Sequence, residues 1–358
     1  MKKTLVALAA LAATGAFAQV TISGNLTGTF GAVEYGGAPS RLDISRASGA
    51  IAFDATEDLG GGLKSSVRIQ QGMYGWGSAG TTAASGISNN TQQNFADRQA
   101  FITLAGPFGA VKLGRDLTML SSATAGVYDV SAVKSINGSN DNTAEAAMLG
   151  NVRASQLTYM TPNFGGAVAY IALSPPNYAG LAANTASTGV LAGTTGIAAN
   201  NMPVAASTAQ DTPVAFGVNY SAGPINLSYD SSNFQESFSG TNFVASTFAA
   251  NYDLGVAKFG FGYQSLTGSD KADTTSLVVS AFVPVGAMLT LGGHYASRSA
   301  VVNGAWTAKE SKHMALGANY NMSKRTTIYA AFFNREVSGG TAEKFDMKET
   351  GVGIHHAF

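Results

Sequence analysis

The stretch TGVGIHHAF, Thr350–Phe358, ends the chain with a regular alternation of two kinds of residue. Val352, Ile354 and Phe358 share one side of an extended backbone, and the residues between them share the other side. A period of two predicts a β-strand with one apolar face and one wetter face. A strand at the end of a chain leaves an unpaired edge, so this pattern requires a partner strand from elsewhere in the sequence.

The composition favours one large all-β domain whose surface carries few charges. The 358 residues include 43 glycines, 45% are hydrophobic and only 12% are charged, against about 25% charged residues in an average soluble domain. Basic and acidic residues balance at 21 each, which gives no sign of a nucleic-acid-binding surface. The chain has no cysteine, so disulfides and thiolate metal sites are excluded.

The N-terminus has the pattern of a secretory signal peptide. Lys2 and Lys3 precede an apolar run over residues 5–13, and Ala16-Phe17-Ala18 has the small-x-small form of a cleavage site. The apolar run is far shorter than the ~20 residues of a spanning helix. We therefore expect residues 1–18 to be a cleaved signal peptide and residues 19–358 to form the mature domain.

The alternation recurs through the mature chain in segments of about 7–12 residues, near the ~9–11 residues with which a tilted strand crosses a membrane. Seven short turns alternate with eight long polar links, which together join sixteen strands. The short turns lie at 57–62, 106–109, 161–166, 221–224, 253–255, 284–287 and 321–325. The long links lie at 31–40, 71–95, 116–152, 174–211, 231–242, 267–274, 298–310 and 335–347.

Links of alternating length indicate a barrel with short turns on one rim and long loops on the other. We therefore predict a 16-stranded antiparallel transmembrane β-barrel in which the terminal strand pairs with the first and leaves no edge. A glycine-rich soluble β-sandwich is the alternative fold that would explain the alternation of apolar and polar residues by itself. It does not account for the even strand number, the one-sided loop lengths and the apolar outward face together.

Five segments resemble the general diffusion porins of Gram-negative bacteria, in particular the neisserial and betaproteobacterial branch. They are EDLGGGLK (57–64), DRQAFITLAGPFGAVKLGR (97–115), YMTPNFGG (159–166), YNMSKRTTIY (320–329) and GIHHAF (353–358). The resemblance implies an outer-membrane homotrimer surrounded by lipid, with the third loop folded into each barrel. It also implies that the barrel-assembly machinery reads the C-terminal Phe358.

Basic residues on the lumen face are the candidates for one wall of a pore constriction. Outward-facing Ile51 and Phe53 send Arg46 inward, Val67 and Ile69 send Lys64 and Arg68 inward, and Val111 and Leu113 send Lys112 inward. Arg98 resembles a porin position on the lumen wall. Arg153 opens the strand that follows the third loop and completes this set.

The third loop, residues 116–152, supplies the opposing charges Asp116, Asp129, Asp141 and Glu145 against the single Lys134. A cationic wall that faces an acidic loop sets up a transverse field that orients polar solutes. The chain departs from the family pattern in two respects. The loop lacks the Pro-Glu-Phe-Gly-Gly tip, and Ala50 stands where the family motif places a wall arginine.

Other site types have weaker support in the sequence. His294 and His313 fall on the lumen faces of adjacent strands, but no serine or carboxylate pattern accompanies them, which favours pore-lining residues over a catalytic or metal site. The Asn/Asp-rich stretch 137–145 lacks the spacing of a calcium loop. We expect a passive channel for small hydrophilic solutes and ions, without enzyme activity or cofactor. The alternative is a substrate-specific channel or an adhesin that uses the long link 174–211.

Overall fold

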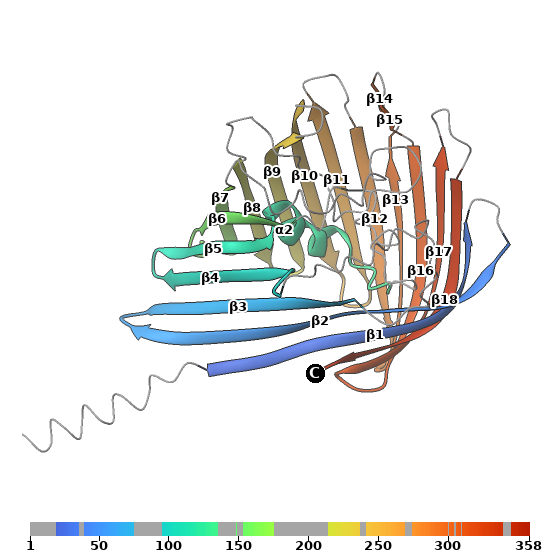
Figure 1. The fold of residues 1–358 in the computed structure, drawn as a ribbon, viewed down its shortest axis with the longest axis horizontal. Coiled ribbons are helices and arrows are strands. Elements are labelled where there is room, and N and C mark those ends of the chain that lie inside the picture. Colours follow the sequence, from blue (N-terminus) through green and yellow to red (C-terminus); the bar gives the residue numbers. More distant parts are fainter. Residues whose placement is uncertain are drawn as a thin grey trace, which may run out of the picture.

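The structure, a computed structural model, describes residues 19–35, 39–74, 95–134, 148, 153–174, 214–236, 241–268, 274–299, 301–303, 306–308, 310–338 and 345–358. Within these residues, sixteen antiparallel strands close into one barrel (Figure 1). The predicted fold and strand number are therefore confirmed. No helix of the described residues is long and apolar enough to cross a membrane.

The first eight barrel strands are β1 (Gln19–Tyr35), β2 (Arg41–Gly60), β3 (Leu63–Tyr74), β4 (Gln99–Gly106), β5 (Gly109–Leu117), β6 (Arg153–Met160), β7 (Ala167–Leu173) and β8 (Val214–Ala222). The others are β9 (Ile225–Glu236), β10 (Thr241–Asp253), β11 (Lys258–Gly268), β12 (Thr274–Val285), β13 (Leu289–Arg298), β16 (Glu310–Asn321), β17 (Thr326–Ser338) and β18 (Phe345–Ala357). Between β13 and β16 lies a small hairpin of β14 (Val301–Asn303) and β15 (Trp306–Ala308). The helix α2 (Met119–Tyr128) follows β5.

The last strand pairs with the first, as the terminal alternation predicts. β1 and β18 run side by side from Asn25 opposite Ala357 to Tyr35 opposite Met347 (Figure 1). The backbone of Phe358 extends the ladder, because its N–H donates to the Gly24 carbonyl at 2.9 Å and its carbonyl accepts from the Gly24 N–H at 3.0 Å. Closure thus gives the backbone N–H and C=O groups of the first and last strands hydrogen-bond partners within the sheet.

All seven predicted short turns join consecutive strands at one rim of the barrel. Gly60, Gly61 and Gly62 at the first of these turns have φ values of 81°, 61° and 81°, which glycine adopts without a steric penalty. Several strands extend beyond the predicted boundaries at the other rim. β1 reaches Tyr35 and β9 reaches Glu236, since these residues still have ladder partners, Met347 on β18 and Thr241 on β10.

The two faces of the barrel wall differ in polarity, as the alternation predicts. On β16, Met314 and Leu316 point outward and are 40% and 54% exposed, whereas His313 and Ala315 point inward and are 4% and 0% exposed. Phe, Leu, Val and Tyr dominate the exposed large residues of the other strands. An apolar exterior around a polar interior is the arrangement that a lipid bilayer requires.

A β-bulge interrupts the simple alternation in β2. Thr27 faces Ser48 and Thr29 faces Ser45, so one residue of β1 stands opposite two of β2. Arg46 lies inside this bulge, where a period of two no longer determines the direction of a side chain. Its side chain lies outside the described residues, and its predicted lumen position stays a prediction.

Candidate pore constriction

Polar side chains of four neighbouring strands form a continuous chain of bonds on the inner wall. Arg68 of β3 donates from Nη1 to Asp54 of β2 at 3.2 Å and from Nε to Gln99 Oε1 at 2.9 Å. Gln99, the first residue of β4, donates from Nε2 to Asp116 of β5 at 2.5 Å, and Asp116 also binds Lys112. We call Asp54, Arg68, Gln99, Asp116 and Lys112 the wall ladder.

The two ion pairs of the wall ladder differ in their contact with solvent. Arg68 and Asp54 are 33% and 34% exposed, whereas Lys112 and Asp116 are 11% and 7% exposed. Lys112 also lies over the ring of Phe101, with its Nζ 5.1 Å from the ring centroid. Water screens the first pair much more than the second, so Arg68 and Asp54 present the accessible charges of this wall.

The expected assignment of Asp116 to the third loop is wrong. Asp116 lies on β5, directly opposite Ala154 of β6, and its carboxylate binds Lys112 of the same strand. β5 continues through Leu117 because each of its last residues has a backbone partner on β6. The inner wall therefore holds carboxylates beside its basic groups and is not uniformly cationic.

The other basic candidates do not join the wall ladder. Lys64 lies at the start of β3, beside the short-turn rim, and is exposed. Arg98 precedes β4 and donates from Nη1 to the Gly49 carbonyl at 3.4 Å. The neighbouring Gln99, an uncharged residue absent from the predicted set, links Arg68 to Asp116.

Arg153 requires a second correction. Along β6, the buried residues Ala154, Gln156 and Thr158 point inward, and the exposed residues Ser155 and Leu157 point outward. Arg153 shares the outward side of this alternation. The expected position on the lumen wall is therefore wrong. Arg153, the first residue of β6, belongs to the set of alternate residues that face the outside of the barrel.

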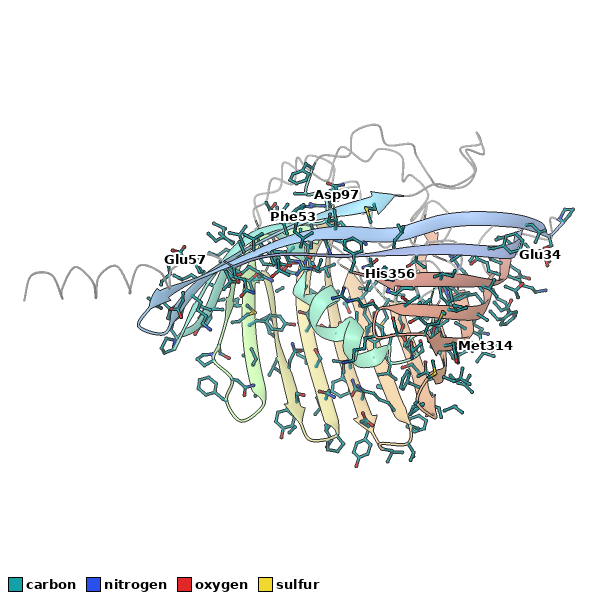
Figure 2. The ribbon with its side chains drawn as sticks, turned by 90° about the horizontal axis from the view of Figure 1, so that it is seen from below. Glu34, Phe53, Glu57, Asp97, Met314 and His356 are labelled. Carbon is teal, nitrogen blue, oxygen red and sulfur yellow. The ribbon has the colours of Figure 1, made fainter. Side chains whose placement is uncertain are left out.

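The chain folds into the barrel directly after β5. Residues 118–134, here called the inward segment, begin with α2, which contacts the wall strands β8 to β12. Figure 2 shows α2 inside the ring of strands. The helix ends where the Asp129 N–H bonds to the Ala125 carbonyl at 3.1 Å. The described part of the third loop thus confirms that this loop folds inward, as the resemblance implies.

Side chains of the wall hold the backbone of the inward segment. Asn251 of β10 donates to the Val127 carbonyl at 3.0 Å, and Ser280 of β12 donates to the Tyr128 carbonyl at 2.6 Å. Further along, Asn319 of β16 donates to the Ala132 carbonyl at 3.1 Å. Side chains of three strands therefore bind carbonyl groups at three points of a segment that, within the described residues, pairs with no strand.

Glycines of the wall let the inward segment lie flat against the strands. A Cβ at Gly260 would stand 2.5 Å from the Tyr128 carbonyl oxygen, and one at Gly292 would stand 1.8 Å from the Ser131 carbonyl oxygen. At Gly262 the added atom would meet the Tyr128 side chain at 2.6 Å. We call Gly260, Gly262 and Gly292 the glycine track, because any larger residue there would displace the segment.

Two apolar clusters inside the barrel complete the attachment. Tyr128 and Met148 pack with Ala249, Val278 and Ala296 of the wall. Val133 packs against the cluster of Ala315, Tyr329, Ala331 and Phe333. This packing explains why the inner face of the barrel carries apolar residues at these positions. The inward segment covers them and so removes them from water.

Asp129 stabilises the turn of the inward segment that follows α2. Its Oδ1 accepts from the Ser131 N–H at 3.0 Å and from the Ser131 hydroxyl at 2.6 Å. The Ser131 hydroxyl also lies 3.3 Å from His294 Nδ1 on β13. Burial lowers the pKa of Lys134 at the far end of the segment. The other expected acids of the loop, Asp141 and Glu145, lie outside the described residues.

A basic patch that no sequence pattern predicts lies on the opposite part of the wall. His313 of β16 faces Arg335 of β17 across the ladder, and its other electrostatic neighbours are His294 and Arg298 of β13. Glu349 of β18, fully buried, lies on the same inner face. Arg298 and Arg335 fall within predicted long links, although both follow the inward phase of the strands that the structure shows there.

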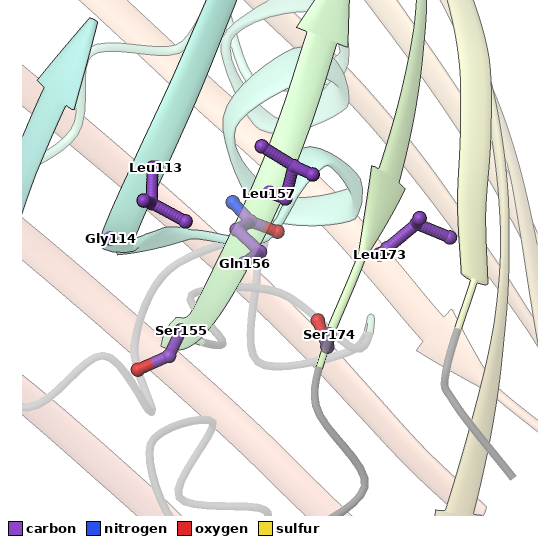
Figure 3. A pocket seen from close by; sticks show the side chains of 7 residues that line it. All are labelled: Leu113, Gly114, Ser155, Gln156, Leu157, Leu173 and Ser174. Carbon is purple, nitrogen blue, oxygen red and sulfur yellow. The ribbon is translucent and has the colours of Figure 1, made fainter.

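The outer face of the barrel carries a cavity of about 280 Å³ at β5, β6 and β7. Figure 3 shows Leu113, Leu157 and Leu173 on these three strands, with Ser155 and Ser174 beside them. The cavity lies on the opposite side of the wall from the constriction, so it takes no part in the lumen.

Comparison with known proteins gives consistent matches over the whole chain. A family described as Gram-negative porin matches residues 4–340. Outer membrane porin protein 32 of Delftia acidovorans is 29% identical over the full length of both chains. The anion-selective porin from Comamonas acidovorans has a TM-score of 0.69 at 22% identity, covering 96% of this chain and 100% of its own. Vibrio cholerae OmpT, solved in a trimer form, has a TM-score of 0.61 at 12% identity over 95% and 99% of the two chains.

Proposed function

This chain belongs to the Gram-negative porin family, and we propose that its outer-membrane channel is narrowest between the wall ladder and the inward segment. The barrel serves the passive diffusion of small hydrophilic solutes. Sixteen strands enclose a lumen too wide for wall side chains to fill. The observation that carries the constriction is the attachment of residues 118–134 to the inner wall by hydrogen bonds, glycine contacts and apolar packing.

The constriction selects by charge as well as by size. The accessible pair of Arg68 and Asp54 belongs to the wall ladder, and Asp129 belongs to the inward segment. A preference for anions is supported by the basic patch around His313 and by the description of the Comamonas relative as anion-selective. Fields in a confined aqueous passage are screened less than on an open surface, so a few such charges bias the passing ions.

The channel acts without catalysis and works as a homotrimer in the Gram-negative outer membrane. The trimer form of the Vibrio relative and the apolar exterior of the barrel support this assembly. Residues 1–18 direct export and are removed, and the remaining chain is the barrel. Phe358, which joins the ladder of β1, is the residue that the barrel-assembly machinery recognises.

Single-channel recording of the purified protein in a planar bilayer tests this function. A large, ohmic conductance that closes in three equal steps is expected of three water-filled channels. Liposomes that contain the protein should also swell in solutions of small sugars and amino acids. A saturable conductance for one solute class would indicate a substrate-specific channel, and the absence of conductance from correctly folded barrels would contradict the proposal.

A further inference from the structure

The basic patch inside the barrel is arranged around His313. On one side Arg335 of β17 lies directly opposite His313, and on the other side Ala296 of β13 lies directly opposite it. His294 and Arg298 are two residues before and after Ala296 and share its inward face. Cβ atoms of directly opposed residues lie about 5 Å apart, and those of diagonal neighbours about 7–8 Å apart. Three basic side chains therefore begin within about 8 Å of His313.

Three polar atoms of this region are buried and have no hydrogen-bond partner within the described residues. They are Nε2 of His294, Nε2 of His313 and Oγ of Ser276, which lies directly opposite Arg298 on β12. The three residues are 5%, 4% and 2% exposed. Buried polar groups of native proteins are almost always hydrogen-bonded. These atoms are therefore the contacts that the patch offers to a polar ligand.

The charges around these atoms favour an anion over a metal cation. Arg335 and Glu349, which also interact with other groups of the barrel, carry opposite charges on adjacent strands. Arg298 adds a further positive charge, and its ladder neighbours on both sides are the uncharged Ser276 and Ser311. Among the described residues, no group of three or more histidine and carboxylate side chains is arranged to hold a metal ion. The ligand that suits this patch is therefore negatively charged.

The hydrogen bonds of the inward segment determine which nitrogen of His294 carries the proton. The Ser131 hydroxyl donates to the Asp129 carboxylate at 2.6 Å, so its oxygen accepts from His294 Nδ1, which lies 3.3 Å away. A neutral imidazole has one donor nitrogen and one acceptor nitrogen. With its proton on Nδ1, His294 presents Nε2 as an acceptor. An anion that satisfies this atom has to carry a hydrogen-bond donor of its own.

We propose that the basic patch is a binding site for inorganic phosphate inside the lumen. The phosphate lies against His313, its oxygens accept paired hydrogen bonds from the Arg298 guanidinium, and its P–OH group donates to His294 Nε2. Arg298 is partly exposed and ends β13 at the rim of the long links, so an anion that enters from this rim meets it first. The site rests on the proposed channel function, since phosphate reaches it through the lumen.

Phosphorus NMR of the folded, full-length barrel in detergent tests the site with inorganic phosphate as the probe. Binding broadens the phosphate signal, and the broadening should saturate as phosphate is added. Arg298→Gln removes the guanidinium, and His313→Leu removes both ring nitrogens. Each variant should weaken phosphate binding about tenfold, because a hydrogen bond to a charged group is lost. If His313→Leu does not give a heat-modifiable barrel, Arg298→Gln alone decides.

Lys312→Gln is the matched control for these variants. Lys312 follows Ser311 and precedes His313 on β16, but its side chain is half-exposed and pairs with Glu310 at 3.2 Å. Its removal takes away one positive charge and should leave phosphate binding unchanged. Equal phosphate binding by the wild type, Arg298→Gln and His313→Leu would overturn the proposal. Weakening by Lys312→Gln as large as that by Arg298→Gln would also overturn it, because binding would then follow the overall charge.

Competition by sulfate tests the chemical class of the ligand. Sulfate has the shape and charge of hydrogen phosphate but carries no hydrogen at neutral pH, so it has no donor for His294 Nε2. It should displace phosphate only at concentrations about tenfold higher than those of phosphate itself. Equally effective competition by sulfate would overturn the assignment to phosphate.

Single-channel recording in potassium chloride keeps the binding site separate from the channel function. The wild type and all three variants should conduct chloride without added phosphate. A barrel that broadens the phosphate signal but does not conduct would contradict the proposed channel and leave the binding site in place. A conducting barrel that leaves the phosphate signal unchanged would overturn the phosphate site alone.

Discussion

The carbonyl oxygen of Ser131 lies so close to Gly292 that a Cβ atom at position 292 would stand 1.8 Å from it. This contact joins the inward segment to the inner face of β13 and extends the attachment made by Asn251 and Ser280. The absence of a side chain at position 292 thus lets the inward segment lie directly against β13.

Replacing Gly292 should narrow the channel. Gly292→Val forces the inward segment away from β13 and into the lumen, which should lower the single-channel conductance and lower the free energy of unfolding by about 1–3 kcal/mol. Gly126→Ala is the matched control, because a Cβ at Gly126 of α2 meets no atom within 4 Å. A Gly292→Val barrel with the conductance of the wild type would contradict the role of the glycine track.

The exposed pair of the wall ladder should influence ion selectivity in opposite directions. Arg68→Ala should lower the anion-to-cation permeability ratio, and Asp54→Asn should raise it, as measured by reversal potentials in a salt gradient. The effects should be larger in dilute salt, since the screening length grows from about 3 Å at 1 M to about 30 Å at 0.01 M.

Lys324→Ala serves as the control for these two variants, because Lys324 is an exposed residue of a short turn. If Lys324→Ala shifts the reversal potential and Arg68→Ala does not, the wall ladder does not line the constriction.

The buried pair should contribute to stability more than the exposed pair. Asp116→Asn leaves Lys112 charged and 11% exposed, and loss of one partner of a buried pair costs about 3–5 kcal/mol. Asp54→Asn removes one partner of a pair that is one-third exposed, and such pairs contribute about 0–1 kcal/mol. The temperature at which the folded barrel converts to the unfolded band in gel electrophoresis should fall clearly for Asp116→Asn alone. Equal shifts in the two variants would contradict this difference.

Removal of Phe358 should impair assembly. The deletion eliminates two backbone hydrogen bonds with Gly24 and the ring that lies against it, where an added Gly24 Cβ would stand 2.5 Å from Phe358 Cζ. Processed but unfolded chain should then accumulate in the periplasm, whereas Phe358→Tyr should assemble. Normal amounts of heat-modifiable trimer in the deletion variant would count against a role for this residue in assembly.

The sequence by itself determines the barrel. Alternation such as that of Val352 and Ile354 specifies which face of each strand meets lipid, and turn glycines such as Gly61 mark the short-turn rim. These signals are local, because strand period and turn conformation depend on residues that are near one another in the chain. The strand period alone thus directs Lys112 and Arg68 to the inner face, where they form ion pairs.

Only the tertiary structure decides how the inner residues combine. Gln99 joins Arg68 to Asp116 because three strands align in register, and the bulge in β2 makes the direction of Arg46 unpredictable from alternation. The inward segment binds Asn251, Ser280 and Gly292, which are more than 100 residues away in the chain. Such long-range contacts have no local sequence signal. Closure of the barrel brings the inner faces of distant strands around one lumen and thereby determines which residues form the constriction.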